Sequence, residues 1–485
     1  MYLKSLHIQN FRCFADYTIE FAPGVTVLFG KNGAGKTTLI NALHKALSFM
    51  MHSEKVKAKD PKTKKLVPIG EKSIRSGNPF VSVEGFSLMG DVHYEGTKRS
   101  DYLMEISATA ELNNQTPLEW AISAYAINCR LRPSEYKQAF QNLYDWHLSA
   151  KELPLLAYYS DSFPHVAMSL SKDKKEQSKE AYHVKNNYPE LGYTEWNSDK
   201  GFTNTWIERL KSKLFNVRDI PHEIESLEEN HESGRVTEEE YTLQKDQLNH
   251  ELQTAKREIA AITDCLNRFF KGDNYYEIVS LGLGRYRRNE IYYIASSGKR
   301  GSIRELPAGY KRLVYIVLDI AYRAYLLSGR TSTDIPGIVI VDEIDLHLHP
   351  ELEQVVLQRL MKTFPSVQFI VSTHSPLVLT GVSTTKPTHR ILRMEPLYSS
   401  ETAPKEPIPM YDIYGLDIDT SIQLVMGVNP TDEELNRLIS RCAYMIKNGF
   451  KEQADNLKNF IYQKCVLSPE AVEKRINKVL ETYSV

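Results

Sequence analysis

The segment from Gly30 to Thr37 reads Gly-Lys-Asn-Gly-Ala-Gly-Lys-Thr, so a lysine and a threonine directly follow a run of closely spaced glycines. It fits the pattern G-x-x-x-x-G-K-[ST]. Because glycine has no Cβ, the backbone N–H groups of such a loop can curl around phosphate oxygens. In this pattern the ammonium of Lys36 contacts the β- and γ-phosphates, and the hydroxyl of Thr37 reaches Mg²⁺. The segment therefore predicts a site for a nucleoside triphosphate with Mg²⁺. Its other predicted nucleotide-binding residues are Asn32, Gly33, Gly35 and Thr38.

Two carboxylates that follow an apolar run form a second group with chemistry. Residues 338–341 are Ile-Val-Ile-Val, and Asp342 and Glu343 come next. Four apolar residues in a row predict a central strand of a parallel sheet, buried on both faces. At its carboxyl end Asp342 is predicted to hold Mg²⁺, directly or through water, and Glu343 to polarise the attacking water. An ordinary strand that ends in two acids is the alternative, but the phosphate loop upstream favours ATP hydrolysis.

A histidine ends another apolar run. Residues 369–373 predict a second core strand, and His374 follows it directly, where it could reach a γ-phosphate. The alternative is a purely structural histidine. Two further histidines, His347 and His349, lie two residues apart, but no cysteine or third histidine has a suitable spacing, so a metal site is not predicted there.

Strands and a helix must position these groups. The apolar run 25–29 predicts a strand that leads into the phosphate loop, and residues 38–43 predict the opening of a helix, so that phosphates would lie at a helix N-terminus. Further strands are predicted near residues 3–11, 17–21, 102–110 and 153–159. Strands that alternate with helices in this way indicate an α/β fold.

Residues 203–271 predict a charged helical block. Thr237 and Glu240 have the spacing of a capping box at the start of its second helix. The apolar residues of that helix alternate four and three residues apart, which is typical of a heptad seam. An antiparallel helical hairpin is the favoured interpretation, and contact with another subunit is the alternative. The residues of the seam are Leu248, Leu252, Ala255, Ile259, Ile262, Leu266 and Phe269.

Residues 52–79 have a different composition. Eight lysines and arginines lie between Lys55 and Arg75, and prolines and a glycine interrupt any helix. We expect a solvated basic loop, with a nucleic-acid contact as an alternative role.

The bulk composition is that of a globular protein. The chain has 485 residues and a net charge of −1, which argues against a general polyanion binder. Its five cysteines are scattered without a C-x-x-C pair, as expected of reduced thiols. No segment approaches the roughly 18 apolar residues that a membrane span needs, and the N-terminus lacks the apolar block of a signal peptide. A cytoplasmic protein without membrane contact is expected.

The order of these motifs resembles the ABC-type ATPase heads of SMC and OLD proteins. The resemblance implies a head with a central, mostly parallel sheet, an antiparallel β portion, a helical insertion and a helical C-terminal tail. It also implies that two heads trap two ATP molecules, each between the phosphate loop of one head and the signature turn of the other. By position, Gly309 in residues 306–312 would be the signature, Asp345 the D-loop aspartate, His374 the switch histidine, and Arg12 a basic residue near the nucleotide. Pro307 departs from the pattern, because a serine usually stands there, and hydrolysis is expected to be slow if the backbone amides do not replace its hydroxyl.

Within this family the chain is most similar to ATPases of bacterial anti-phage defence, namely the Septu ATPase PtuA and its retron-associated forms. Residues 153–159, 309–313, 319–323 and 343–350 carry that similarity, as does the tail from residue 414. It implies a homodimer or higher oligomer that controls an HNH nuclease partner. Nucleic acid would be contacted through that complex, and this chain shows no nuclease motif of its own.

Two alternatives differ in class. One is the sensor ATPase of another two-gene defence system, like AriA of PARIS, and the other is an SMC-type DNA-repair ATPase, against which the short helical block argues. The predicted domains are an N-terminal lobe over 1–202, the helical insertion over 203–271, a C-terminal lobe over 272–395 and a partner-docking helical region over 396–485.

Overall fold

The computed structural model forms two compact units, Met1–Gly415 and Leu416–Val485. It describes residues 1–59, 66–74, 82–87, 90–91, 103–112, 116–125, 128–150, 152–161, 163, 189–196, 203–284, 290–395, 406–410, 413–416, 433–464 and 469–482.

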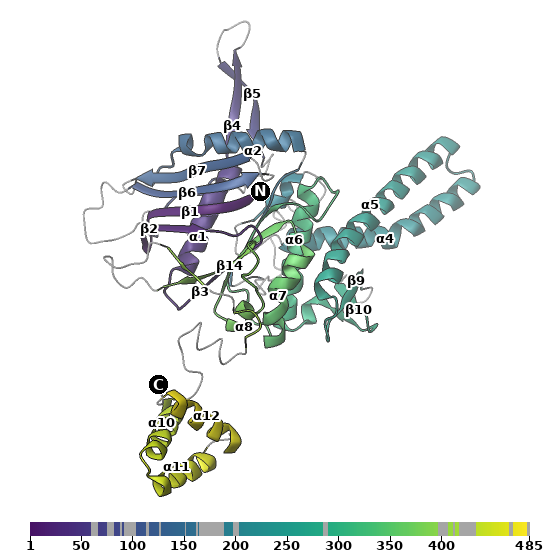
Figure 1. Cartoon of the computed structure of the whole chain (residues 1–485). Coiled ribbons are helices and arrows are strands. Elements are labelled where there is room, and N and C mark those ends of the chain that lie inside the picture. Colours follow the sequence, from purple (N-terminus) through teal and green to yellow (C-terminus); the bar gives the residue numbers. More distant parts are fainter. Residues whose placement is uncertain are drawn as a thin grey trace. The chain divides into compact units, whose positions relative to one another are not determined.

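A six-stranded sheet is the centre of the first unit (Figure 1). Five strands are parallel in the order β14, β3, β13, β12, β8, and β15 pairs antiparallel with β14. Every residue of β3, β8, β12 and β13 is buried, as expected for parallel strands covered on both faces. The carboxyl ends of β3, β13 and β12 therefore meet at one edge of the sheet. The bounds are β3 Val25–Gly30, β8 Leu155–Tyr159, β12 Gly337–Val341, β13 Val367–Thr373, β14 His389–Met394 and β15 Ile408–Pro409.

An antiparallel sheet of four strands, in the order β2, β1, β6, β7, forms the β portion of the same unit. Helix α1 (Lys36–Leu47) contacts β3 as well as β1, β6 and β7, so it lies between the two sheets (Figure 1). Helix α2 (Lys137–Ala150) packs against β7. The strands are β1 Tyr2–Phe11, β2 Phe14–Glu20, β6 Leu103–Leu112 and β7 Thr116–Tyr125, and the 3₁₀ helices of the unit are Ser48–Met51, Pro133–Glu135, Pro189–Tyr193 and Ile303–Glu305.

The basic segment corrects a sequence prediction. The loop predicted over 52–79 is wrong for most of its described residues, because β4 (Ser53–Lys59) and β5 (Leu66–Ser73) form an antiparallel hairpin. Pro68, which was expected only to interrupt a helix, lies in β5 and pairs with Lys57 next to the register shift between Val56 and Lys57. Proline is tolerated in a strand at such an irregularity. The rest of the predicted loop, residues 60–65 and 75–79, lies outside the described residues.

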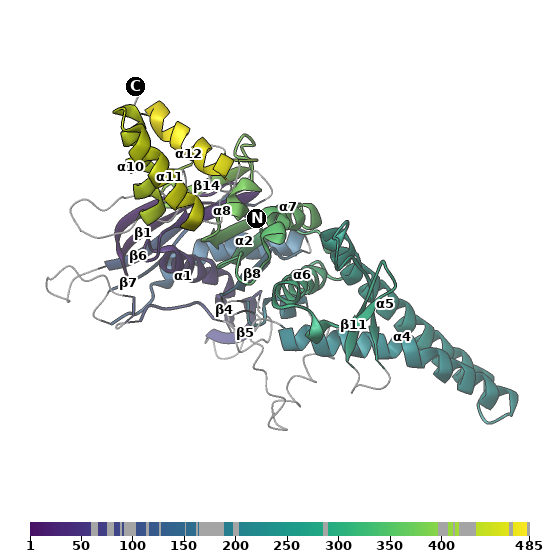
Figure 2. The same ribbon diagram turned by 90° about the horizontal axis from the view of Figure 1, so that it is seen from below.

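The helical block is an antiparallel hairpin, as predicted. Helices α4 (Thr203–Glu232) and α5 (Glu238–Phe270) run side by side (Figure 2). The capping box is confirmed, because Thr237 Oγ1 accepts from the Glu240 N–H at 3.4 Å and Glu240 Oε2 accepts from the Thr237 N–H at 3.2 Å.

The base of the hairpin is anchored by a buried ion pair between α4 and α5. Arg209 donates to both carboxylate oxygens of Glu258, at 2.5 and 2.8 Å, and the two side chains are 4% and 0% exposed. Near this base, α5 packs against α6 (Ala308–Leu327), α7 (Pro350–Thr363) and β9. The remaining elements here are the antiparallel strands β9 Ile278–Leu283, β10 Ile291–Ala295 and β11 Arg300–Ser302, and helix α8 Pro376–Thr380.

The second unit is a small helical cluster with a core of its own. Its helices are α10 Glu433–Lys447, α11 Lys451–Lys464 and α12 Pro469–Thr482. All three contribute to the core, with buried Ile439 on α10, Ile461 on α11 and Ile476 on α12. The predicted helical C-terminal region is therefore present, although β15, which precedes it, belongs to the sheet of the first unit.

The predicted fold class is confirmed. A mostly parallel sheet, an antiparallel portion, a helical insertion and C-terminal helices are all present. Within the residues that the structure describes, no helix combines the length and apolar character needed to cross a bilayer.

Candidate nucleotide-binding and catalytic site

The predicted phosphate loop joins the end of β3 to the start of α1. Gly35 lies in the left-handed region at φ +87°, and a Cβ there would lie 2.8 Å from Cζ of Phe14 and 3.2 Å from Sγ of Cys13. Gly33 is also left-handed, at φ +81°, but no heavy atom lies within 4 Å of a Cβ built on it. Position 35 therefore requires glycine for both conformation and space, and position 33 for conformation alone. Asn32, beside Gly33, is exposed.

Helix α1 begins at this loop and presents an uncapped N-terminus. Its N-cap residue is Gly35, no side chain caps it, and its first turn carries no acidic residue. Thr37 is exposed and Thr38 is half-buried in this first turn. Lys36 is buried, and its Nζ donates to the carbonyl of Gly30 at 2.7 Å. Backbone N–H groups, an ammonium and the helix dipole thus converge as a site for phosphate.

The two predicted catalytic carboxylates lie at the carboxyl end of β12. Ser372, on the neighbouring strand β13, connects them: its hydroxyl donates to the carboxylate of Asp342 and accepts from the Glu343 N–H at 2.8 Å. Glu343 has a left-handed backbone at φ +49°, a conformation that costs on the order of 1 kcal/mol for a non-glycine residue. A strained backbone conformation persists only where surrounding contacts stabilise it, so the hydrogen bond from the Glu343 N–H to Ser372 fixes the turn that carries Glu343.

The electrostatics of the pair suit metal binding and proton transfer. Burial, and then the charge of Asp161, raise the pKa of Asp342, although Ser372 and Lys36 oppose the shift. Burial and the neighbouring Asp342 raise the pKa of Glu343. Burial lowers the pKa of Lys36, while these same carboxylates act in the opposite direction, so the phosphate loop and the carboxylates share one electrostatic site.

Asp345 and His374 join the same edge of the sheet. Thr373, the last residue of β13, donates its hydroxyl to Asp345 Oδ1 at 2.5 Å, and the His374 N–H donates to the same oxygen at 3.3 Å. His374 is half-buried, and its charge lowers the pKa of Glu343, against the direction set by burial. The structure therefore brings Lys36, the carboxylates and His374 together.

Gly309 lies at the N-terminus of α6 and faces a different pocket. A Cβ at Gly309 would lie 2.4 Å from the carbonyl oxygen of His347, so the turn packs closely on the segment after Asp345. The N-cap of α6 is Pro307, which supplies no side-chain cap. A pocket of about 330 Å³ is lined by residues that include Pro307, Gly309, Tyr310, His347 and His349, and no described residue of the phosphate loop lines it.

Arg312 is a site residue that sequence reasoning missed. It is 1% exposed, and its guanidinium donates to the carbonyls of Glu343 at 2.7 Å and Asp342 at 2.9 Å. It also reaches the carbonyls of Ser160 at 3.3 Å and Leu346 at 3.4 Å. The sequence does contain a signal for this residue. Arg312 lies one turn after Gly309 and directly before an apolar run, which indicates that its charged side chain is buried and needs polar partners.

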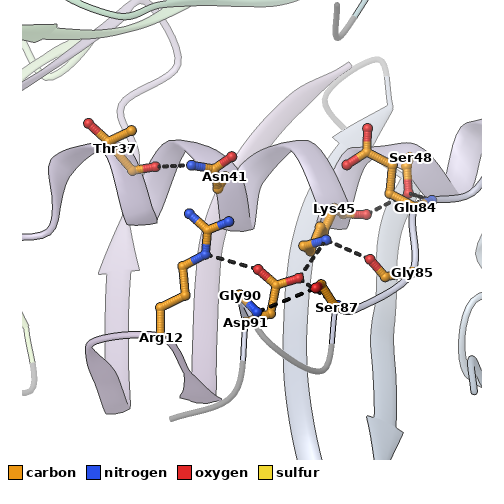
Figure 3. A network of polar contacts seen from close by, with 10 residues as sticks. All are labelled: Arg12, Thr37, Asn41, Lys45, Ser48, Glu84, Gly85, Ser87, Gly90 and Asp91. Carbon is orange, nitrogen blue, oxygen red and sulfur yellow. Dashed lines mark hydrogen bonds and ion pairs between the residues drawn. The ribbon is translucent and has the colours of Figure 1, made fainter. Parts of the chain in front are cut away.

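Arg12 lies at the junction of β1 and β2 with a left-handed backbone at φ +51°. Its Nε donates to Asp91 Oδ1 at 2.9 Å. In Figure 3 its guanidinium lies beneath the turn of α1 that carries Thr37 and Asn41. The structure thus places Arg12 beside the phosphate-loop helix, and Asp91, which sequence reasoning did not select, is its carboxylate partner.

The residues present fit Mg²⁺. Proteins usually bind this ion through one or two carboxylates together with phosphate oxygens and water. Asp342 is a buried carboxylate whose pKa is raised by burial and by the charge of Asp161, and a divalent cation would offset that repulsion. Asp342 and Thr37 are the residues that would hold the ion.

Comparisons with known proteins agree with this site. Residues 1–379 match the family model described as the AAA ATPase domain. The chain is 26% identical over 412 residues to the retron Vc95 probable ATPase of Vibrio cholerae serotype O1 biovar El Tor, which covers 79% of this chain and 72% of that protein. It is 35% identical over 99 residues to the Septu protein PtuA of Bacillus mycoides (strain KBAB4), which covers 20% of this chain and 14% of that protein.

Among solved structures, the SMC head domain from Thermotoga maritima aligns with a TM-score of 0.37 at 13% identity, over 84% of this chain and 99% of that chain. The family model alone spans more than three quarters of the sequence, from the first strand through β13 and into α8. The chain therefore belongs to the AAA ATPase domain family, related to the ATPases of retrons and of Septu.

Proposed function

We propose that this chain is the ATP-binding and ATP-hydrolysing regulatory subunit of a cytoplasmic anti-phage defence complex. Two copies would close head to head on Mg-ATP, and the closed state would control an HNH nuclease partner like PtuB.

One observation carries the proposal. At a single edge of the sheet, the structure gathers a glycine loop at a helix N-terminus, a buried lysine, two carboxylates with raised pKa values and a histidine. Such a set can bind a triphosphate with Lys36 and the loop amides, hold Mg²⁺ at Asp342, and use Glu343 to accept a proton from the attacking water. His374 would contact the γ-phosphate.

The position of Gly309 supports the dimer. No described residue of the phosphate loop lines the pocket beside Gly309, and in the proposed dimer the N-terminus of α6 would contact a nucleotide that the phosphate loop of the other chain holds. Asp345 lies between the two sets of residues, since it follows Glu343 and precedes the segment that packs on Gly309. ATP would drive closure only if it binds the closed pair more tightly than the open heads.

The similarity to retron and Septu ATPases supports the defence role, and the resemblance to PtuA supports the HNH partner. The helical hairpin argues against an SMC-type tether. Its helices have 30 and 33 residues, which at about 1.5 Å per residue makes an arm on the order of 50 Å. An arm that bridges distant DNA segments would need to be far longer.

The test is Glu343→Gln, with Lys36→Ala as its matched control. Glu343→Gln should retain Mg-ATP for at least tenfold longer than the wild type and shift the chain to dimers on light scattering, because the base is lost while phosphate contacts stay. Lys36→Ala should bind no nucleotide and stay unshifted. If Glu343→Gln turns over ATP at the wild-type rate, or never changes its oligomeric state with ATP, the proposed cycle is wrong.

The partner is tested separately. The full chain is co-expressed with the product of the adjacent gene, which the proposal expects to be an HNH protein, and DNA cleavage is followed with and without ATP. Cleavage that responds to ATP, and that Lys36→Ala uncouples, supports the proposal. An ATP-independent nuclease, or a neighbouring TOPRIM-type gene in place of the HNH gene, would favour the AriA-like alternative.

A further inference from the structure

The carboxylate of Asp91 receives three N–H groups beside the phosphate-loop helix (Figure 3). Arg12 Nε donates to Oδ1 at 2.9 Å, and Ser87 N–H donates to Oδ2 at 2.8 Å. The ammonium of Lys45, on α1, lies 3.1 Å from the same Oδ2. The Asp91 side chain is only 2% exposed, whereas that of Arg12 is 33% exposed. A buried carboxylate therefore connects a partly exposed arginine to α1.

The charge of Asp91 is maintained despite its burial. Burial alone would raise its pKa, but the Ser87 amide, Lys45 and Arg12 together bring the pKa below its usual value. Asp91 is consequently ionised at neutral pH. Withdrawing a carboxylate from water costs free energy that good geometry only partly offsets, so such a pair is weak evidence of a stabilising role.

The segment around Asp91 is attached to α1 without help from Arg12. Lys45 donates to the carbonyl of Gly85 at 2.5 Å, and the Glu84 N–H donates to Ser48 Oγ at 2.8 Å. Residues 84–87 therefore form a strap that is fixed to Lys45, near the end of α1, and to Ser48, which directly follows the helix. Asp91 then extends from this strap to Arg12, both through its carboxylate and by accepting the Arg12 N–H on its backbone oxygen at 2.8 Å.

The same helix starts at the phosphate loop. Thr37, Asn41 and Lys45 are four residues apart, so they lie along one face of α1, and Asn41 donates to the Thr37 carbonyl at 2.7 Å. In Figure 3 the guanidinium of Arg12 lies beneath this face, below Asn41 and one turn from Thr37. An arginine has five N–H donors in one rigid plane, so a bond through Nε sets the direction of the whole fork.

We propose that Asp91 is a positioning residue that aims the guanidinium of Arg12 at the phosphates of a nucleotide bound at the start of α1. The inference rests on the proposed function, because it concerns the same nucleotide. Asp91 itself touches no phosphate. It fixes the plane of the Arg12 guanidinium, and the strap of residues 84–87 fixes Asp91 relative to α1.

The experiment measures the affinity of the full-length chain for a fluorescent ATP analogue with Mg²⁺. Asp91→Asn keeps the shape of the side chain and removes its charge, and it should weaken binding about tenfold or more, as expected for one hydrogen bond between charged groups. Arg12→Ala should weaken binding at least as much. The double variant should bind no more weakly than Arg12→Ala alone, because Asp91 acts only through Arg12. Additive losses would overturn the proposal.

Arg12→Lys provides a test that does not alter Asp91. Lysine keeps the charge but not the planar fork, so it should lose most of the affinity that alanine loses. Wild-type affinity in this variant would mean that only charge matters, and the proposal would fall. Asp16→Asn is the control, because Asp16 lies in the same sheet, is half exposed and pairs only with His7 among the ion pairs described. It should bind like the wild type.

The outcomes separate the two claims. If the wild type binds no Mg-ATP, the proposed function fails, and this inference with it. If the wild type binds and either Asp91→Asn or Arg12→Lys retains its affinity, only the positioning role fails. Thermal unfolding of each variant without nucleotide shows whether a loss of affinity is a loss of folding.

Discussion

Replacing Arg312 by methionine should separate nucleotide binding from hydrolysis. The guanidinium of Arg312 holds the turn that carries Glu343 through backbone carbonyls alone, and methionine can fill much of the same volume without donating to them. Lys36 and the glycine loop are not among its hydrogen-bond partners. The variant should therefore bind ATP nearly as the wild type does, while the catalytic carboxylate loses its position.

The size of the effect follows from the contacts. The bonds to Glu343 at 2.7 Å and Asp342 at 2.9 Å are short, and each hydrogen bond from a charged group contributes about 1.5–3 kcal/mol. Burial lowers the pKa of Arg312, so its removal recovers part of this free energy. A net loss of about 3 kcal/mol remains, which corresponds to a fall of roughly 6 °C in the melting temperature of a large domain. A displacement of about 1 Å in a catalytic group lowers turnover roughly a hundredfold.

The assay compares Arg312→Met with Arg323→Met in ATP turnover, ATP affinity and thermal unfolding. Arg323 is an equally buried arginine on the same helix, but its hydrogen bonds go to Asp319, Gly192 and Thr194. Both variants should lose stability, and only Arg312→Met should lose turnover about a hundredfold with less than threefold change in affinity. Equal losses of turnover in the two variants would refute the reasoning, since they would trace the effect to general destabilisation.

Two further predictions concern the phosphate loop and the helix behind it. Gly35→Ala should lower the melting temperature without nucleotide more than Gly33→Ala does, because both incur a left-handed strain of about 1–2 kcal/mol but only a Cβ at position 35 meets Phe14, at 2.8 Å; equal shifts would show that the loop yields at no cost. His44 is buried, and burial lowers its pKa to about 3. As pH falls below the usual histidine pKa, the unfolded chain takes up a proton that the folded chain does not, so stability should fall by about 1.4 kcal/mol per pH unit. His44→Phe should remove this part of the slope in urea unfolding between pH 7 and pH 5, and an unchanged slope would contradict the assignment.

The central sheet and its edge were predictable because their signals are local. The apolar runs before Gly30, Asp342 and His374 each form a buried strand, and parallel strands necessarily place their carboxyl ends together. The helical hairpin was predictable for the same reason, since a capping box at Thr237 and a regular apolar seam are both read from neighbouring residues.

Pairings between distant residues were not predictable. Arg12 and Asp91 are 79 positions apart, and no local pattern around Asp91 distinguishes it from a surface aspartate. Arg312 donates to backbone carbonyl groups, and every residue has one. Its hydrogen-bond partners therefore cannot be identified from residue types in the sequence. The β4–β5 hairpin was missed because its lysines and Pro68 suggest a loop, whereas cross-strand backbone pairing forms the strands.

The ion pair between Arg209 and Glu258 has a mechanical consequence. Removing either partner of such a pair from its buried position is strongly unfavourable, so α4 and α5 resist parting at their root. A force applied at the distal turn of the hairpin then moves α4 and α5 as one rigid unit, because the two helices do not separate at their base. Because α5 packs against both α6 and α7, a tilt of the hairpin would displace these two helices, which begin at Ala308 and at Pro350.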